Sequence, residues 1–228
     1  MTLSWLRYPT LLCLCLLGTW ASANTLRVAY DADPVSLDPY EQLSGGTLQL
    51  AHLLYDPLIR WTPKQDFEGR LATAWQRLDS RTIRFNLRHD VTFSSGNPMT
   101  ALDVKWSLLR AKSSPDFKGI FKPISQARVI DSHTVDLITE QPYALLENMA
   151  TQLFVMDSLH YQGFDHNQRA KDAVEKHGHS YASEHASGTG PYHVTQRQQG
   201  TLLKLTRNPV YWDHASPGNV QHISLTPI

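Results

Sequence analysis

The feature that most constrains the fold is a strict alternation of apolar and polar residues in Thr82–Leu87. Ile83, Phe85 and Leu87 alternate with a threonine, an arginine and an asparagine. Such a pattern is typical of an antiparallel strand with one buried and one solvated face. Other strand patterns mix with helical ones, but without the regular βαβ order of a parallel sheet. We therefore expect an α+β or mixed α/β fold with antiparallel hairpins.

The remaining elements follow from periodicity and from turn and cap signals. Thr100 followed by Asp103 matches a helix capping box, and Ser132-His133 separates two strand patterns as a hairpin turn does. We predict strands at 26–30, 58–61 and 223–228, hairpins joining 128–131 to 134–138 and 192–195 to 202–206, and helices at 48–55, 100–112, 142–149 and 168–176.

Residues 1–23 have the pattern of a cleaved secretory signal peptide. Arg7 provides the positive charge, residues 11–17 form a short apolar run, and Ala21-Ser22-Ala23 provides the small residues of a cleavage site. The apolar run is shorter than the roughly 20 residues that span a bilayer. We therefore expect these residues to be removed, which leaves an exported, soluble chain of residues 24–228.

Composition excludes several classes of function. Cys13 and Cys15 both lie in the expected leader, so residues 24–228 can form no disulfide, cysteine metal site or cysteine nucleophile. Loss of Arg7 takes the balance from 21 basic and 21 acidic residues to a net charge near −1. Neither nucleic acid nor an anionic membrane is expected as a partner of such a chain.

Four segments in a fixed order carry a resemblance to a known family. They are 35–39 (V-S-L-D-P), 71–96 with its strand pair and Ser94-Ser95-Gly96 turn, 98–107 (P-M-T-A-L-D-V-K-W-S), and 188–192 (G-T-G-P-Y) followed by 205–212. Together they resemble the family 5 solute-binding proteins of bacterial ABC importers, which include dipeptide-, oligopeptide- and nickel-binding proteins. Leu102, where a glutamate is frequent, is one departure from the family pattern.

The resemblance implies a periplasmic binding protein of type II, in which the ligand lies in a cleft between two lobes. By motif order the chain covers the first lobe only and lacks the second, and residues 223–228 lie near the first crossing between lobes. The implied function is non-enzymatic: binding of a di- or oligopeptide, or another small solute, without a cofactor. A monomer delivering its solute to an inner-membrane permease is expected.

The candidate ligand-binding residues are Ser44, Gly45, Gly46, Thr47 and Tyr192. In peptide-binding relatives the corresponding loop lines the cleft, and glycines before a buried helix allow close approach of a ligand to backbone amides. A simple helix-start turn capped by Thr47 is the alternative for this loop. Tyr192 could equally pack beneath the hinge.

Other chemistry finds less support in the sequence. His177, His179 and His185 suggest a metal- or haem-binding alternative, but they lack helical metal-ligand spacing, and a solvated loop fits them better. There is no G-x-S-x-G nucleophile motif, the 188–193 segment lacks the third glycine of a dinucleotide fingerprint, and the carboxylates near Asp38 have no evident substrate. We predict no catalytic residue. A further hypothesis is a truncated chain without binding activity of its own.

Overall fold

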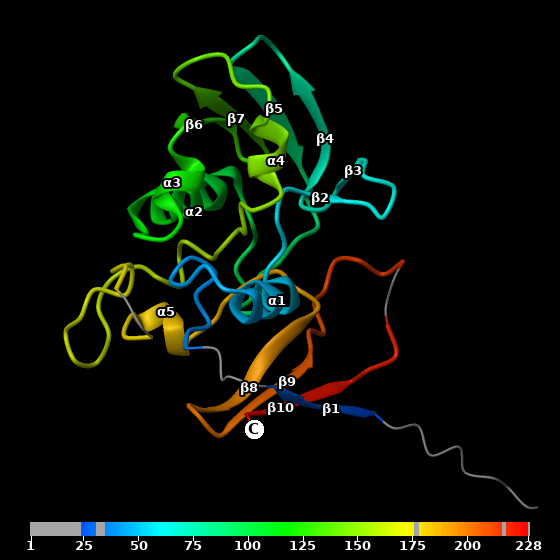
Figure 1. Ribbon diagram of the computed structural model, residues 1–228, viewed down its shortest axis with the longest axis vertical. Coiled ribbons are helices and arrows are strands. Elements are labelled where there is room, and N and C mark those ends of the chain that lie inside the picture. The colour runs from blue at the N-terminus through cyan, green and yellow to red at the C-terminus, as the bar shows by residue number, and fades with distance from the viewer. Residues whose placement is uncertain (1–23, 31–34, 176–177, 216–217, 228) are drawn as a thin grey trace, which may run out of the picture.

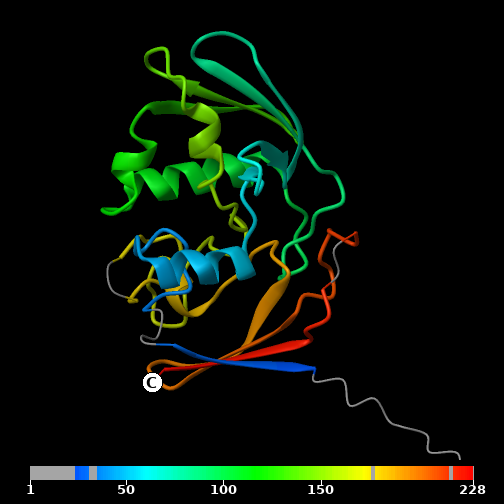
Figure 2. The same ribbon diagram turned by 45° about the vertical axis from the view of Figure 1, so that its right-hand side comes forward.

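The computed structural model describes residues 24–30, 35–175, 178–215 and 218–227. The predicted signal peptide and His177 lie outside these residues. The molecule has four layers, with a sheet at the top, two layers of helices that face each other, and a second sheet at the bottom (Figure 2). Within the described residues, no helix combines the length and apolar character needed to cross a membrane.

The upper half is a contiguous stretch of chain. Its sheet has the strand order β4 (Ala72–Arg77), β5 (Thr82–Leu87), β7 (Thr134–Thr139), β6 (Ile124–Asp131), all antiparallel. The helices α2 (Ala101–Ser113), α3 (Lys118–Phe121) and α4 (Leu146–Ala150) belong to this half, and α2 packs against β6 and β7. A small hairpin, β2 (Ile59–Trp61) with β3 (Phe67–Gly69), lies beside it.

The lower half joins residues from both ends of the described chain. Its sheet has the order β1 (Thr25–Tyr30), β10 (His222–Pro227), β9 (Leu202–Arg207), β8 (Tyr192–Gln198). The strands β1 and β10 are parallel, whereas β9 is antiparallel to both of its neighbours. The helix α1 (Gly45–Leu54) covers this sheet, and the short α5 (Tyr181–Glu184) lies beside it (Figures 1 and 2).

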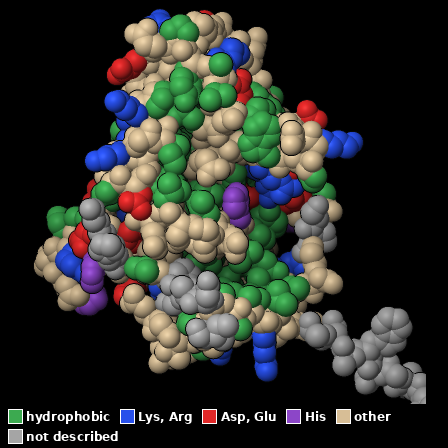
Figure 3. Space-filling model, viewed as in Figure 1, with side chains coloured by type: hydrophobic (Ala, Val, Ile, Leu, Met, Phe, Trp, Pro, Cys, Tyr) green, Lys and Arg blue, Asp and Glu red, His purple; other side chains and the backbone are tan. Residues whose placement is uncertain are grey.

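Side-chain burial confirms the apolar face of β5, where Ile83, Phe85 and Leu87 are at most 1 % exposed. The other face is less solvated than the alternation predicts, because only Asn86 is exposed, whereas Arg84 is half-buried and Thr82 is buried. The α2 start is also as predicted, because the Asp103 carboxylate accepts the backbone N–H of Thr100 (2.7 Å). Hydrophobic side chains continue to the surface along the middle of the molecule, where the two halves meet (Figure 3).

Three predicted helices differ from the structure. The turn predicted at residues 45–47 is the first turn of α1, which begins at Gly45 instead of Leu48. Residues 168–175 are not helical, because the Asp165 carboxylate accepts N–H groups of Asn167 (2.8 Å) and Arg169 (2.9 Å), and Gln168 between them has φ = 60°. Such an Asx-type turn competes with a helix for the same backbone groups. The helix predicted from Pro142 begins only at Leu146. The predicted strand at the end of the chain is confirmed as β10, which lies inside the lower sheet.

Candidate functional site

The candidate site lies where the lower sheet meets the start of α1. Because β1 and β10 are parallel, their carboxyl ends share one edge of the sheet, and the chain leads from β1 to the N-terminus of α1. In open α/β sheets, ligands bind outside the carboxyl ends of parallel strands. This edge is therefore the first place to look for a binding surface.

Two backbone donors at the start of α1 are unused. Ser44 is the N-cap, and its hydroxyl accepts the N–H of Thr47 (3.3 Å) while its carbonyl accepts that of Leu48 (3.0 Å). The N–H groups of Gly45 and Gly46 have no partner among the described residues, and both glycines are exposed. Free amides at the positive end of a ten-residue helix attract a carboxylate or a carbonyl oxygen.

The two glycines are not explained by the fold. Neither has a positive φ, and a Cβ atom added at either position would meet nothing within 4 Å. Neither backbone geometry nor packing therefore requires a glycine there. Open space above unpaired amides is what close approach of a ligand needs.

Thr47 has a different place from the one predicted. Its side chain is buried, and its hydroxyl accepts a hydrogen bond from Ser44 (3.0 Å). The alternative in which Thr47 caps the helix is wrong, because Ser44 precedes it with extended backbone and makes the cap contact. Thr47 orients the cap from inside, and a ligand at this surface would meet Ser44 and the two glycines first.

An exposed carboxylate that the sequence did not reveal stands next to these donors. Asp116, in the turn after α2, accepts the backbone N–H of Leu43 (3.1 Å) through Oδ2. Leu43 is two residues from Gly45, so the Asp116 carboxylate is attached to the segment that leads into the two free donors. The contact joins residues that are 73 positions apart, and nothing local in the sequence indicates it.

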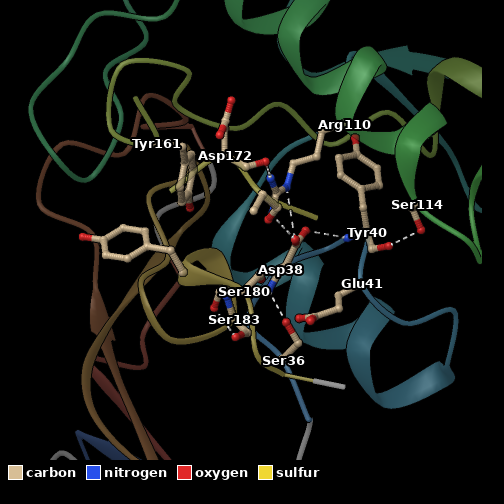
Figure 4. A network of polar contacts seen from close by, with 12 residues as sticks. Ser36, Asp38, Tyr40, Glu41, Arg110, Ser114, Tyr161, Asp172, Ser180 and Ser183 are labelled. Carbon is tan, nitrogen blue, oxygen red and sulfur yellow. Dashed lines mark hydrogen bonds and ion pairs between the residues drawn. The ribbon is translucent and has the colours of Figure 1, made fainter. Parts of the chain in front are cut away.

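A buried ion pair fixes the loop that leads to α1 (Figure 4). Asp38 accepts Nε (3.1 Å) and Nη2 (2.6 Å) of Arg110, and each side chain is 1 % exposed. Arg110 also donates to the carbonyl of Asp172 (2.7 Å), and Ser114 donates to the carbonyl of Tyr40 (2.6 Å). Asp38 thus faces an arginine and not a substrate, and the 35–41 segment is attached to α2.

Glu41, in the same network, is a buried carboxyl with incomplete hydrogen bonding. It is 5 % exposed, and Oε1 accepts the N–H of Gly178 (3.0 Å), whereas Oε2 has no partner among the described residues. Burial raises the pKa of Glu41, and the nearby Asp38 carboxylate raises it further. The group therefore resists ionisation next to the candidate surface.

Tyr192, the second predicted contact, lies at the other end of α1. It is half-buried, and its hydroxyl donates to the carbonyl of Val220 (3.0 Å). Gly190, two residues earlier, donates to the carbonyl of Leu54 at the C-terminus of α1 (3.0 Å). A ten-residue helix is about 15 Å long. The structure does not bring Tyr192 together with the Ser44 loop.

A second buried network explains the motif segments near residues 188–192 and 205–212. Asp56 pairs with Arg70 (2.8 Å) and accepts the indole N–H of Trp212 (3.0 Å) and the hydroxyl of Thr189 (3.2 Å). Arg70 also pairs with Asp213 (3.2 Å). Burial raises the pKa of Asp56, although Arg70 opposes the shift. These residues hold the two halves together, as expected of scaffold positions.

The late histidines do not form a metal centre in the described part of the chain. His185 stacks on Tyr181 (4.1 Å between ring centroids), and its Nδ1 contacts the Tyr181 carbonyl (3.0 Å). No group of three or more His, Cys, Asp or Glu side chains converges among the described residues. The metal- or haem-binding alternative therefore gains no support from them.

Comparison with known proteins gives the class to which this two-sheet fold belongs, the bacterial solute-binding proteins. The family model described as bacterial extracellular solute-binding proteins, family 5 (middle), matches residues 66–228. The chain belongs to this family, and the resemblance inferred from the four segments is confirmed.

Individual relatives agree with this membership. The chain is 28 % identical to the probable D,D-dipeptide-binding periplasmic protein DdpA of Escherichia coli K12, in a match covering 92 % of the chain and 41 % of the relative. It is 26 % identical to the glutathione-binding protein GsiB of Salmonella choleraesuis, covering 86 % of the chain and 37 % of the relative. The chain thus spans about two fifths of the length of these curated relatives.

A solved structure confirms the fold. The dipeptide binding protein from Pseudoalteromonas sp. SM9913, in complex with Met-Leu, superposes with a TM-score of 0.75 at 23 % identity. The match covers 90 % of this chain and 43 % of that one. The mixed α/β fold with antiparallel hairpins is therefore the predicted one, although the lower sheet also contains a parallel pair, and the chain corresponds to part of the larger protein.

Proposed function

We propose that this chain forms the solute-binding lobe of a periplasmic component of an ABC importer, and that its solute is a di- or oligopeptide. The observation that carries the proposal is the pair of unpaired amides at Gly45 and Gly46, in open space beside the Asp116 carboxylate. Family membership and the dipeptide and glutathione named for two relatives support the choice of solute. No chemical step is involved, and the solute leaves unchanged to the permease.

The arrangement suits one end of an extended peptide. Its carbonyl or carboxylate oxygen would accept from the α1 amides, and Asp116 would accept from a peptide N–H or ammonium group. Each lobe of such a protein provides only part of the contacts, so this lobe alone should bind with a Kd no tighter than roughly millimolar. The export signal in residues 1–23 and a monomeric state belong to the same proposal, and Asn24 should be the first residue of the exported protein.

Removal of a single backbone donor tests the site. Proline is favoured at the first position of a helix and has no N–H, so Gly45→Pro deletes one donor without opposing the helix. Gly45→Ala is the matched control, because it keeps the N–H and its Cβ meets open space. Alanyl-alanine is titrated into the ¹⁵N-labelled protein, and NMR shifts of Gly46 report binding.

We expect the proline variant to bind at least about fivefold more weakly than the alanine variant, as loss of one hydrogen bond to a charged group implies. Asp116→Asn should weaken binding as well. Equal affinity of the two Gly45 variants, or the absence of shifts at residues 43–48, would refute the site. Micromolar binding by this lobe alone would refute the assumption that a second lobe completes the contacts.

A further inference from the structure

The helix α2 has an apolar stripe on the face opposite to its core face. Val104, Leu108 and Ala111 are buried against the upper sheet, as an amphipathic helix requires. Leu102 and Leu109, seven positions apart, are nevertheless 61 % and 55 % exposed. Trp106 lies between them at helical spacing and is half-buried. Contiguous exposed apolar side chains of this size mark interaction surfaces.

A second wall turns this stripe into a groove. Leu159 is 55 % exposed and faces the stripe together with Gln162, and the space between the walls is about 410 Å³. We call this the α2 groove and define it by Leu102, Lys105, Trp106, Leu109, Leu159 and Gln162. It is separate from the α1 surface proposed to hold the solute.

The walls of the α2 groove are held in place by buried contacts. Asp103 accepts both the backbone N–H (3.0 Å) and the hydroxyl (2.7 Å) of Ser158. The rings of Trp106 and Tyr161 stack with centroids 5.6 Å apart and planes 6° from parallel. A groove with fixed walls binds without the loss of conformational entropy that a flexible surface incurs.

Two charged residues line the groove, and only one of them is available to a partner. Asp103 is buried, and its two carboxylate oxygens accept hydrogen bonds from Thr100 and Ser158. Lys105 lies between Leu102 and Leu109 on α2, is exposed, and makes no ion pair with any described carboxylate. An ammonium group amid apolar side chains favours a partner that places a carboxylate beside its own apolar residues. If two copies of this chain packed their α2 helices antiparallel at Trp106, the two Lys105 side chains would lie close together with no carboxylate between them to balance the charge. The charge thus disfavours self-association.

We propose that the α2 groove docks an amphipathic helix of a partner protein, with apolar side chains at i, i+3 or i+4 spacing and one acidic residue among them. The stripe from Leu102 to Leu109 is about 10 Å long, which matches two turns of such a helix. The apolar anchors fill the groove, and the acidic residue pairs with Lys105. This surface is an addition to the solute-binding function and does not depend on it.

Synthetic helices test the proposal because the partner itself is unidentified. The probe is a fluorescein-labelled, capped amphipathic peptide of about 14 residues, roughly four turns, with a leucine stripe and one glutamate in the stripe. A second peptide has lysine in place of that glutamate. Binding to the purified full chain is followed by fluorescence anisotropy.

The glutamate peptide should bind at least about tenfold more tightly than the lysine peptide, and Lys105→Glu should reverse the preference. Leu109→Glu should abolish binding. Leu145→Glu is the matched control, since Leu145 is 54 % exposed and outside the groove. Exposed substitutions of this kind change stability little, and circular dichroism verifies the fold.

Three outcomes would overturn the proposal. The first is equal affinity for the two peptides, and the second is equal effects of Leu109→Glu and Leu145→Glu on binding. The third is no binding of the glutamate peptide up to about 1 mM, where a Kd of that size corresponds to a binding free energy of about −4 kcal/mol. Dimerisation of the chain that is lost in Leu109→Glu, measured by sedimentation, would assign the groove to a second copy and refute the helical partner.

Discussion

The buried pair of Asp38 and Arg110 provides the sharpest test of how this lobe is held together. Arg110→Met keeps the length of the side chain but removes its charge. The Asp38 carboxyl, which is 1 % exposed, then has no ion-pair partner. Loss of one partner of a buried ion pair costs about 3–5 kcal/mol. Because domains of this size are stable by roughly 5–15 kcal/mol, the variant should lose at least about a fifth of its stability.

Urea unfolding followed by far-UV circular dichroism measures this effect. Tryptophan fluorescence is less suitable as a probe, because the Arg110 guanidinium carbon lies 5.5 Å from the ring centre of Trp106 and its loss would change the fluorescence directly. We expect a lower midpoint at an unchanged slope. Arg128→Met is the matched control. Arg128 pairs with Asp136 but is half exposed, and Arg84 still pairs with Asp136, so the loss should stay below about 1 kcal/mol.

The double variant Asp38→Asn/Arg110→Met distinguishes pairing from packing. Removal of both charges leaves no uncompensated ion, so its cost should be clearly below the sum of the two single costs. Additive single effects would contradict the reasoning, as would an Arg110→Met loss no larger than that of Arg128→Met. Should Arg110→Met not fold, the milder Asp38→Asn variant allows the same comparison.

Three further predictions concern single positions. Glu41→Gln should raise the melting temperature most at the highest pH tested, because ionisation of the buried carboxyl destabilises the fold, and the gain should shrink as the pH falls through the raised pKa of Glu41; a gain independent of pH would contradict this. Gly190→Ala should destabilise the chain by more than about 2 kcal/mol, because its Cβ would lie 2.6 Å from a backbone oxygen of α1, whereas Gly119→Ala should be nearly neutral in the same urea assay. Hydrogen bonds from Arg84 and Arg128 lower the pKa of Asp136 in the folded protein. The ionised Asp136 carboxylate therefore stabilises the fold fully above its unfolded-state pKa near 4, and this stabilisation is lost as the pH falls through the lowered folded-state pKa. Replacement by Asn should therefore matter at pH 7 and much less near pH 2, as thermal melts at the two pH values can show.

Much of the fold follows from local patterns. The alternation of β5, the Thr100–Asp103 cap and the two hairpins depend on neighbours in the sequence, and the structure has them where they are predicted. The helix predicted at 168–176 fails because one side chain, Asp165, satisfies backbone groups that a helix would need.

The candidate site was predictable only in part. A glycine pair before a helix gives a sequence signal, and the two unpaired amides are where that signal points. Asp116 gives none, because its place beside Leu43 depends on how α2 and the 35–44 segment meet in space. The same holds for Glu41, whose burial results from contacts with a loop more than a hundred residues away. Long-range packing decides these positions, and periodicity does not report on it.

The parallel pairing of β1 with β10 has a consequence for how the protein is made. The upper half is contiguous in sequence and can fold while synthesis is still under way, since chains generally fold from the N-terminal side as they emerge. Thr25, however, pairs with His222. The first strand of the lower sheet therefore stays without its neighbour until nearly all described residues are present. During that interval β1 exposes unpaired backbone groups, on which another extended segment can pair before β10 is present.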